Sequence, residues 1–277
     1  MKGVQERTLA ILELLAKHAE GMELAAIADR LDIPRSAVHR LLTDLSISGY
    51  VRQVRKHGDY LLTTKLVSIG LSFLSNSGIV DIAQPLLNRL AEISGELVRL
   101  SVVDGDRLTW VARAQGARQG LRYDPDMGAD ARLSCSSTGW AWLSTFADEE
   151  AIAKVRKQGL GKVRDYGPNA PQGIKKLLSF IQTTRKLGFS MTEETYAHGL
   201  NAISAPVRLV SQPSLGVLTI AGPNFRLTPK RMKALGPELV SYASQLATTS
   251  GSSPYFNPMQ RSKSPIQGIN RKLIYAE

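Results

Sequence analysis

Two short amphipathic segments follow each other between residues 23 and 49 with almost no connection between them. The first, "ELAAIADRL", spaces its apolar residues along one helix face, and the second, from about Pro34 to Ser46, does the same. Only "DIP" separates them; Pro34 is tolerated in the first turn of a helix, and Gly49 ends the second segment. The pattern predicts a two-helix unit joined by a tight turn, and another amphipathic helix is predicted over residues 5–19.

A β-type pattern follows the helices. Residues 50–54 and 60–63 are two short β runs, and the Lys-His-Gly-Asp sequence between them is a hairpin signal. Three helices followed by a hairpin form the winged helix-turn-helix pattern, in which the second helix of the pair enters the major groove of DNA. We therefore predict a winged helix-turn-helix domain over residues 1–64.

The predicted recognition helix and the hairpin both carry side chains suited to DNA. Arginine contacts guanine or phosphate, serine and threonine are adaptable donors and acceptors, and cations on a hairpin lie along phosphates. The candidate DNA-binding residues are Arg35, Ser36, His39, Arg40, Thr43, Arg52, Arg55 and Lys56. His57 is a further potential cation of the hairpin. The alternative is a surface pair of helices with solvated arginines, which the cationic hairpin makes less favoured. A purely structural interaction module does not account for the cationic hairpin.

The composition bounds the class of protein. The chain has 277 residues, 43% of them apolar, which is enough for two domains with real cores. Its single cysteine excludes an intramolecular disulfide and fits a reducing compartment. Neither a signal peptide nor a membrane span is visible, so we expect a cytoplasmic protein. The net charge of +11 favours a polyanionic partner, although the excess is spread along the chain.

The rest of the chain alternates helical and hairpin patterns. Residues 65–78 are predicted to be a linker helix that ends at a Ser-Asn-Ser-Gly boundary. Residues 79–250 contain several amphipathic helices, the hairpin "ELVRLSVVDGDRLTWVARA" and the strands "NAISAPVRL" and "SLGVLTIAGP". These patterns predict an α+β domain with an antiparallel sheet, and so a two-domain α+β protein. Residues 251–277, rich in Ser, Pro, Gln and Lys, are predicted to be a flexible tail.

The segment "LSCSSTGWAWL" (residues 133–143) places five small or hydroxylic residues directly before a helix that is expected to start near Gly139. Free backbone N–H groups and the dipole at a helix N-terminus favour an anion, and the hydroxyls of Ser136, Ser137 and Thr138 could complete an anion cradle. The alternative is that these hydroxyls only cap the helix. By themselves the residues favour capping.

Several segments between residues 4 and 248 together carry a resemblance. The stretch "LAAIADRLDIPRSAVHRLLTDLSISGYVRQ", the hairpin strand "GDYLLTT" and the later segments "DGDRLTWVAR", "GFSMTEE", "GLNAISAPV" and "GVLTIAGP" resemble, in order and spacing, the IclR family of bacterial transcriptional regulators. Arg7 matches the arginine that commonly begins the first helix of that family, and it joins the candidate DNA-binding residues. The resemblance implies homodimers, often paired as tetramers, that bind an operator and either repress or activate transcription.

The same resemblance implies a GAF-like second domain whose pocket binds a small-molecule effector, often a carboxylate or an aromatic acid. The candidate effector-binding residues that it implies are Ser136, Ser137, Thr138, Gly139, Thr192, Glu194, Ala202, Thr219 and Ala221. Two positions depart from the family pattern, because Ser134 stands where the family often has His and Trp140 where it often has Lys. We hypothesise that Trp140 and Trp142 favour a flatter, more apolar ligand, with only one of the two indoles facing the pocket.

An enzymatic alternative rests on Cys135, because a helix N-terminus lowers the pKa of a thiol. His198 is the one histidine outside the N-terminal domain, and no orienting partner for it is visible. Glu193 and Glu194 are adjacent, so on a strand their side chains point in opposite directions. The sequence shows no metal-spaced Cys/His cluster and no cofactor-binding glycine motif, so we expect neither a metal nor a cofactor. We predict a DNA-binding regulator controlled by a small metabolite, with a small-molecule enzyme using Cys135 as the alternative.

Overall fold

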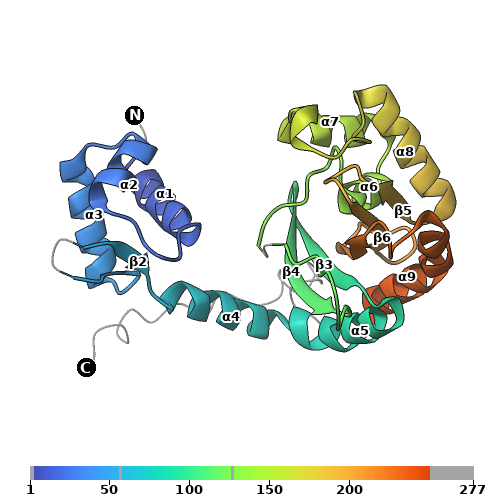
Figure 1. Cartoon of the computed structure of the whole chain (residues 1–277), viewed down its shortest axis with the longest axis horizontal. Helices are drawn as coiled ribbons and strands as arrows, with labels where there is room; N and C mark the ends of the chain where they lie inside the picture. Colours follow the sequence, from blue (N-terminus) through green and yellow to red (C-terminus); the bar gives the residue numbers. More distant parts are fainter. Residues whose placement is uncertain (1–2, 56–57, 126–127, 250–277) are drawn as a thin grey trace. The chain divides into compact units, whose positions relative to one another are not determined.

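The computed structural model describes residues 3–55, 58–125 and 128–249. The chain divides between Asn76 and Ser77 into two compact units, each with its own core (Figure 1). Lys56 and His57 at the tip of the predicted hairpin lie outside the described residues, as does the predicted tail, residues 251–277.

The first unit, within the described residues, consists of helices and a two-stranded hairpin. Its elements are α1 (Val4–Ala16), α2 (Leu24–Leu31), α3 (Arg35–Ile47), β1 (Val51–Gln53), β2 (Tyr60–Leu62) and α4 (Lys65–Ser77). The two strands are antiparallel, with Val51 opposite Leu62 and Gln53 opposite Tyr60. Three helices followed by this hairpin confirm the predicted winged helix-turn-helix fold.

A tight turn joins α2 to α3. Asp32 ends α2 with a left-handed backbone (φ +52°), and the Ile33 N–H donates to the Ala28 carbonyl at 3.1 Å. Pro34 precedes the first helical residue of α3, where its fixed φ suits the entry into a helix. The core takes fully buried side chains from each of the first three helices, namely Ile11, Ile27, Val38 and Leu42.

The second unit is an antiparallel sheet with helices on both faces. Its elements within the described residues are α5 (Ile79–Ser94), β3 (Leu97–Asp104), β4 (Arg107–Gln115), α6 (Ser137–Leu143), α7 (Asp148–Gln158), a short 3₁₀ helix (Val163–Asp165), α8 (Ile174–Leu187), β5 (Ser190–Glu193), β6 (Leu200–Val207), β7 (Gly216–Pro223) and α9 (Pro229–Thr249). The strand order is β4-β3-β7-β6-β5, with every neighbouring pair antiparallel, which confirms the predicted α+β fold. The prediction did not include β5, because a four-residue edge strand carries too short a pattern.

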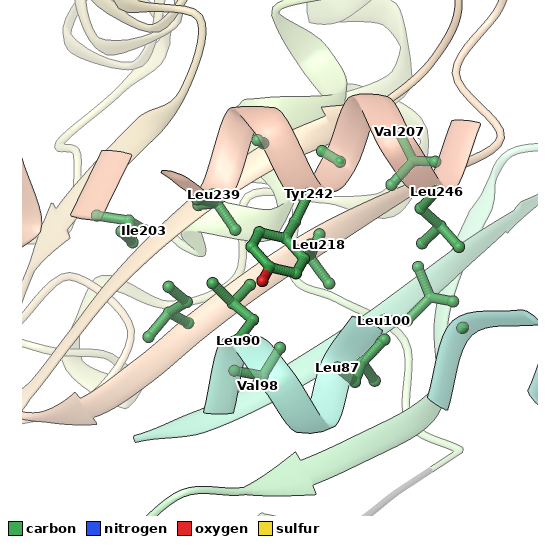
Figure 2. Packing of buried hydrophobic residues seen from close by; sticks show 14 of the residues in the cluster. Leu87, Leu90, Val98, Leu100, Ile203, Val207, Leu218, Leu239, Tyr242 and Leu246 are labelled. Atoms are coloured by element: carbon green, nitrogen blue, oxygen red, sulfur yellow. The ribbon is translucent and has the colours of Figure 1, made fainter. Parts of the chain in front are cut away.

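The sheet separates two layers of apolar side chains. On one face α5 and α9 pack against the strands, and Figure 2 shows Leu90 of α5 meeting Leu239 and Tyr242 of α9. On the other face α6, α7 and α8 cover the sheet, with Trp140 and Trp142 among the largest fully buried side chains. Because both faces are covered, polar side chains of the sheet have to find partners inside the unit.

Membrane spans and metal sites leave recognisable patterns in a structure. Among the described residues, no single helix is both long and apolar enough to span a membrane. Only a bent pair formed by α4 and most of α5 reaches that length and composition together, and Leu87 and Leu90 of α5 are fully buried. In the same part of the chain, no group of three His, Cys, Asp or Glu side chains is placed to bind a metal ion.

One ion pair ties the start of β3 to the segment after β7. Glu96 has a side chain only 1% exposed, and its carboxylate oxygens accept from Nε and Nη2 of Arg226, both at 2.8 Å. Arg226 also donates from Nη1 to the Leu121 carbonyl at 2.9 Å. Glu96 raises the pKa of Arg226. Because the carboxylate is desolvated, each charge of the pair depends on the other for compensation.

We expect Glu96→Gln to lower the free energy of unfolding by about 2–3 kcal/mol, because it leaves the Arg226 guanidinium without its counter-charge. Asp106→Asn is the matched control. Asp106 lies at the surface, where Lys157 and Lys154 lower its pKa to about 2 but water screens both pairs. Urea unfolding followed by circular dichroism measures both variants. Equal losses in the two would contradict a special role for the buried pair.

Candidate functional site

The outward face of α3 is polar and exposed. Arg35, the first residue of α3, and Arg40 take part in no ion pair within the described residues. Ser36, His39 and Thr43 are exposed on the same helix, and the Thr43 hydroxyl donates back to the His39 carbonyl at 2.9 Å. The inward face is buried and consists of Val38, Leu41, Leu42 and Leu45. The helix is therefore anchored by its apolar side while its donors and acceptors face outward, as contact with a DNA groove requires.

The hairpin continues this polar surface. Arg52 on β1 and Arg55 just after it are exposed. A groove of about 410 Å³ lies between the start of α2, α3 and the hairpin, with Arg35 and His39 in its wall. Arg7 on α1 is half-buried. Of the candidate DNA-binding residues, Arg35 and His39 line this groove, opposite Gln53 and Tyr60 of the hairpin.

A pocket lies in the second unit, on the sheet face that α6 covers. It encloses about 20 Å³, which is room for roughly one water molecule. The lining side chains come from every strand of the sheet, from the start of α6 and from loops, and they are Arg99, Trp110, Tyr123, Ser136, Ser137, Thr138, Thr192, Tyr196, Leu200, Ala202, Thr219 and Ala221.

The antiparallel register aligns the polar side chains beneath α6. Arg99 on β3 lies opposite Thr219 on β7, Thr219 lies opposite Ser204 on β6, and Ser204 lies opposite Ser190 on β5. Directly opposed residues point to the same face of a sheet, so these four side chains form one polar row. The row crosses an otherwise apolar layer, which makes the pairing of each member decisive for stability.

Hydroxyl groups of α6 close over this row. Ser137 Oγ lies 2.8 Å from Ser204 Oγ, and Thr138 Oγ1 lies 2.9 Å from Thr219 Oγ1. The hydroxyls of Ser204 and Thr219 are 2.8 Å apart, so the four groups form one continuous chain. Each hydroxyl can donate one proton and accept others, and the chain therefore satisfies its members internally.

Arg99 is not satisfied in this way. The residue is 4% exposed, and neither Nε nor Nη1 has a hydrogen-bond partner. The guanidinium stacks on the indole of Trp110, 3.8 Å from the ring centroid, and the Trp110 N–H also lacks a partner. Burial lowers the pKa of Arg99, and Tyr123 and Tyr196 oppose that shift only in part. The pocket wall therefore carries three buried donors without an acceptor.

Comparison with known families covers both units. The chain matches the family model described as "IclR helix-turn-helix domain" over residues 5–55, and the model described as "Bacterial transcriptional regulator IclR C-terminal" over residues 71–248. The chain belongs to the IclR family of bacterial transcriptional regulators. The resemblance expected from the sequence is thereby confirmed, and so is a DNA-binding regulator built from these two domains.

Relatives of known name or structure span nearly the whole chain. The acetate operon repressor of Salmonella typhimurium is 29% identical over 246 residues, which are 88% of this chain and 89% of that protein. The crystal structure of an IclR-type regulator from Alicyclobacillus acidocaldarius has a TM-score of 0.77 at 20% identity, covering 91% of this chain and 100% of that one. That of an IclR homologue from Microbacterium hydrocarbonoxydans, complexed with 4-hydroxybenzoate, has a TM-score of 0.71 at 15% identity, covering 89% and 100%.

Most residues that the IclR resemblance implied for the effector lie on the pocket described above. These are Ser136, Ser137, Thr138, Thr192, Ala202, Thr219 and Ala221. Gly139 and Glu194 do not line it. Each of these two residues has a local structural role instead of a place in the pocket wall.

Gly139 is a packing glycine. A Cβ at this position would lie 2.6 Å from the Cα of Leu133, so no larger residue fits. The helix also begins earlier than expected, because α6 starts at Ser137 and Ser136 is its N-cap, accepting from the Gly139 N–H at 3.0 Å. The capping alternative is therefore correct for Ser136, although that residue also lines the pocket.

Glu194 and the two tryptophans of α6 face other partners. Glu194 has a left-handed backbone (φ +50°), and its carboxylate lies 3.2 Å from Nδ1 of His198. Trp140 stacks on Phe180 of α8 with ring centroids 4.4 Å apart, and Trp142 lies in the same core. Neither indole lines the pocket described above, because α6 directs both into the layer beneath α7 and α8, where Trp140 lines a separate cavity of about 650 Å³.

Sequence reasoning missed the lining residues Arg99, Trp110, Tyr123, Tyr196 and Leu200. Arg99 had a detectable signal, because it is the one charge inside the apolar run "LVRLSVV" of a strand. Trp110 had none. Ser101 pairs with Trp110 while Leu100 pairs with Ala112, so one extra residue bulges out of β4 and brings Trp110 to the face of Arg99.

Cys135 lacks the activated thiol that the enzymatic alternative requires. The residue is 1% exposed, and burial raises the pKa of its thiol to about 11. The expected lowering by a helix N-terminus is therefore wrong, because desolvation disfavours the thiolate more strongly. The side chain of His198 is 88% exposed and pairs with Glu194 rather than with this thiol.

We expect Cys135 in the native protein to react with a disulfide reagent at about pH 7.5 at least about 100-fold more slowly than in concentrated guanidinium chloride. The thiolate is the reactive species, and a raised pKa means that it appears only as the pH approaches 11. Absorbance of the released thiol measures both rates. Similar rates in the two conditions would contradict the buried, protonated state.

Proposed function

We propose that this IclR-family regulator binds a pseudo-palindromic operator as a homodimer, represses transcription there, and changes its DNA affinity when a small carboxylic acid enters the pocket of the second unit. The observation that carries the DNA-binding part is the exposed polar face of α3 beside exposed hairpin arginines. The acetate operon repressor supports repression as the outcome. Because such a regulator acts on the chromosome, we place it in the cytoplasm.

We assign base contacts to the outward face of α3 and phosphate contacts mainly to the hairpin. The guanidinium groups of Arg35 and Arg40 suit guanine edges, and the cations of the hairpin suit the charged backbone. The proposed DNA-binding residues are Arg7, Arg35, Ser36, His39, Arg40, Thr43, Arg52, Arg55 and Lys56. Of these, Lys56 lies outside the described residues and Arg7 is half-buried.

A homodimer follows from the size of the reading surface. One short helix contacts too few base pairs for specificity, so two copies on two half-sites are the expected arrangement. Val67 and Leu71, four residues apart on α4, are 58% and 60% exposed, and exposed apolar surface of this kind favours a protein–protein contact. We propose a dimer, with a dimer of dimers as a higher state.

We propose that the effector is an aromatic or other carboxylic acid. The pocket offers aromatic walls in Trp110, Tyr123 and Tyr196 and hydroxyl groups in Ser137 and Thr138. An IclR homologue of the same fold was crystallised with 4-hydroxybenzoate, which supports this class of ligand. To regulate, the acid has to bind more tightly to one of two states that differ in DNA affinity.

Footprinting of genomic DNA with the purified protein identifies the operator and tests the proposal directly. On that operator we expect Arg35→Ala and Arg40→Ala each to lose about 1–3 kcal/mol of discrimination against non-operator DNA. Lys56→Ala should weaken binding to both DNAs alike and flatten the dependence on salt. Arg156→Ala, which removes an exposed arginine of α7, is the control for lost charge alone. Identical affinities of all four variants and wild type across salt concentrations would exclude α3 and the hairpin.

We expect Ala202→Leu to remove the response to the effector while operator binding is kept. A leucine fills the wall of a pocket that encloses only about 20 Å³, so the affinity for a 4-hydroxybenzoate probe should fall at least about tenfold. Ala202→Ser, which adds little volume, is the control. Fluorescence anisotropy of labelled operator with and without the probe measures the response. An unchanged response in the leucine variant would place the effector elsewhere.

A further inference from the structure

Arg99 holds an uncompensated positive charge inside the second unit. Its guanidinium stays protonated when buried, and Nε and Nη1 have no acceptor. Arg226 of the same unit has the usual compensation for an arginine, because the Glu96 carboxylate accepts hydrogen bonds from two of its N–H groups at 2.8 Å. Among the described residues, no carboxylate pairs with Arg99 in this way. Arg113, the charged neighbour whose field reaches Arg99, is also a cation, and it adds to the lowering of the Arg99 pKa that burial causes.

We infer that Arg99 is the specificity-determining residue of the pocket, and that it binds the carboxylate of a monocarboxylic acid with the Trp110 N–H as a further donor. This inference rests on the proposed effector role of the pocket. A carboxylate is acceptor-only and offers about four lone-pair sites, which suits the three unpaired donors of Arg99 and Trp110. A buried charge without a partner is costly, and an entering anion would remove that cost.

The surrounding side chains restrict what the rest of the acid can be. Arg99 lies opposite Thr219 in the sheet, and Thr219 belongs to the hydroxyl chain that is already satisfied. Besides Arg99, the pocket wall consists of hydroxylic side chains, the rings of Trp110, Tyr123 and Tyr196, and the apolar side chains of Leu200, Ala202 and Ala221. A second charged group on the ligand would find no counter-charge among these residues. The pocket therefore favours acids with one carboxylate and an uncharged body.

Tyr123 also lines this pocket. It comes from the loop after β4, its carbonyl accepts from Gln115 Nε2 at 3.1 Å, and its side chain interacts with Arg99. The cavity is too small for an aromatic acid as it stands. Movement of the Tyr123 side chain away from Arg99 would enlarge the pocket beside the two donors that have no partner. An aromatic acid and a short aliphatic acid both carry the carboxylate that Arg99 would bind. The two classes differ in size, so one probe of each size distinguishes them.

The test compares wild type, Arg99→Met and Arg99→Gln as full chains, with benzoate and acetate as probes and benzamide and acetamide as their uncharged controls. Arg113→Met is the matched control variant, because Arg113 lies opposite Arg99 on β4 but pairs with Asp124 at the surface. Calorimetric titration gives the affinities, thermal unfolding gives Tm, and anisotropy on the operator shows that each variant still binds DNA.

We expect wild type to bind at least one acid at least about tenfold more tightly than its amide, and both Arg99 variants to lose that preference. Without ligand, Arg99→Met should raise Tm by about 2–4 °C, because it removes an unpaired buried charge. Arg113→Met should keep the preference. A response to benzoate alone assigns aromatic acids, and a response to acetate alone assigns short aliphatic acids.

Three results would overturn the inference. Binding of the acid by Arg99→Met and Arg99→Gln as tightly as by wild type would remove Arg99 from recognition while leaving the effector role of the pocket intact. No preference of wild type for an acid over its amide would exclude carboxylate recognition, whereas operator binding, measured separately, would still stand. A lower Tm of ligand-free Arg99→Met than of Arg113→Met would mark Arg99 as a structural residue.

Discussion

The second unit depends on one constraint: a sheet covered by helices on both faces has no water available for its polar side chains. Such groups have to be paired within the protein, since an unpaired buried donor costs free energy. Ser137, Thr138, Ser204 and Thr219 meet this demand through a chain of hydroxyl contacts of 2.8–2.9 Å. Glu96 meets it through Arg226. Arg99 does not meet it at Nε and Nη1, and we propose that a ligand binds there.

Two features of backbone geometry build this exception. The antiparallel register sets Arg99 in a row with Thr219 and the serines of β5 and β6. The bulge in β4 then moves Trp110 to the same face, where its ring lies 3.8 Å from the guanidinium. Stacking on an aromatic ring stabilises a cation but leaves its in-plane donors unused. The pocket therefore holds a fixed guanidinium with unpaired donors, which is the basis of the anion site that we propose.

The first unit uses the opposite arrangement, with its polar side chains directed into solvent. Val38 and Leu42 hold α3 against α1 and α2, so the outward residues keep fixed positions without needing partners of their own. DNA contact needs such a rigid element with free donors. Both units therefore carry hydrogen-bonding groups that are available to a ligand. On α3 these groups are exposed, so leaving them unpaired costs little free energy, whereas at Arg99 they are buried and leaving them unpaired destabilises the fold.

The local patterns in the sequence determined the winged helix-turn-helix, the outward face of α3 and the α+β class, because helix periodicity and turn residues act over a few positions. Among the pocket residues, Thr192, Ala202, Thr219 and Ala221 were found through the family resemblance alone, whereas Ser136, Ser137 and Thr138 were already candidates from their place at a helix N-terminus. Arg99 and Trp110 were missed because their meeting depends on strand register and on one bulged residue, which are set by long-range pairing. Long-range packing also decided the surroundings of Trp140 and Cys135. The packing of α6 against α8 places Trp140 on Phe180, and burial raises the pKa of the Cys135 thiol, and neither environment can be derived from the spacing of residues in the sequence.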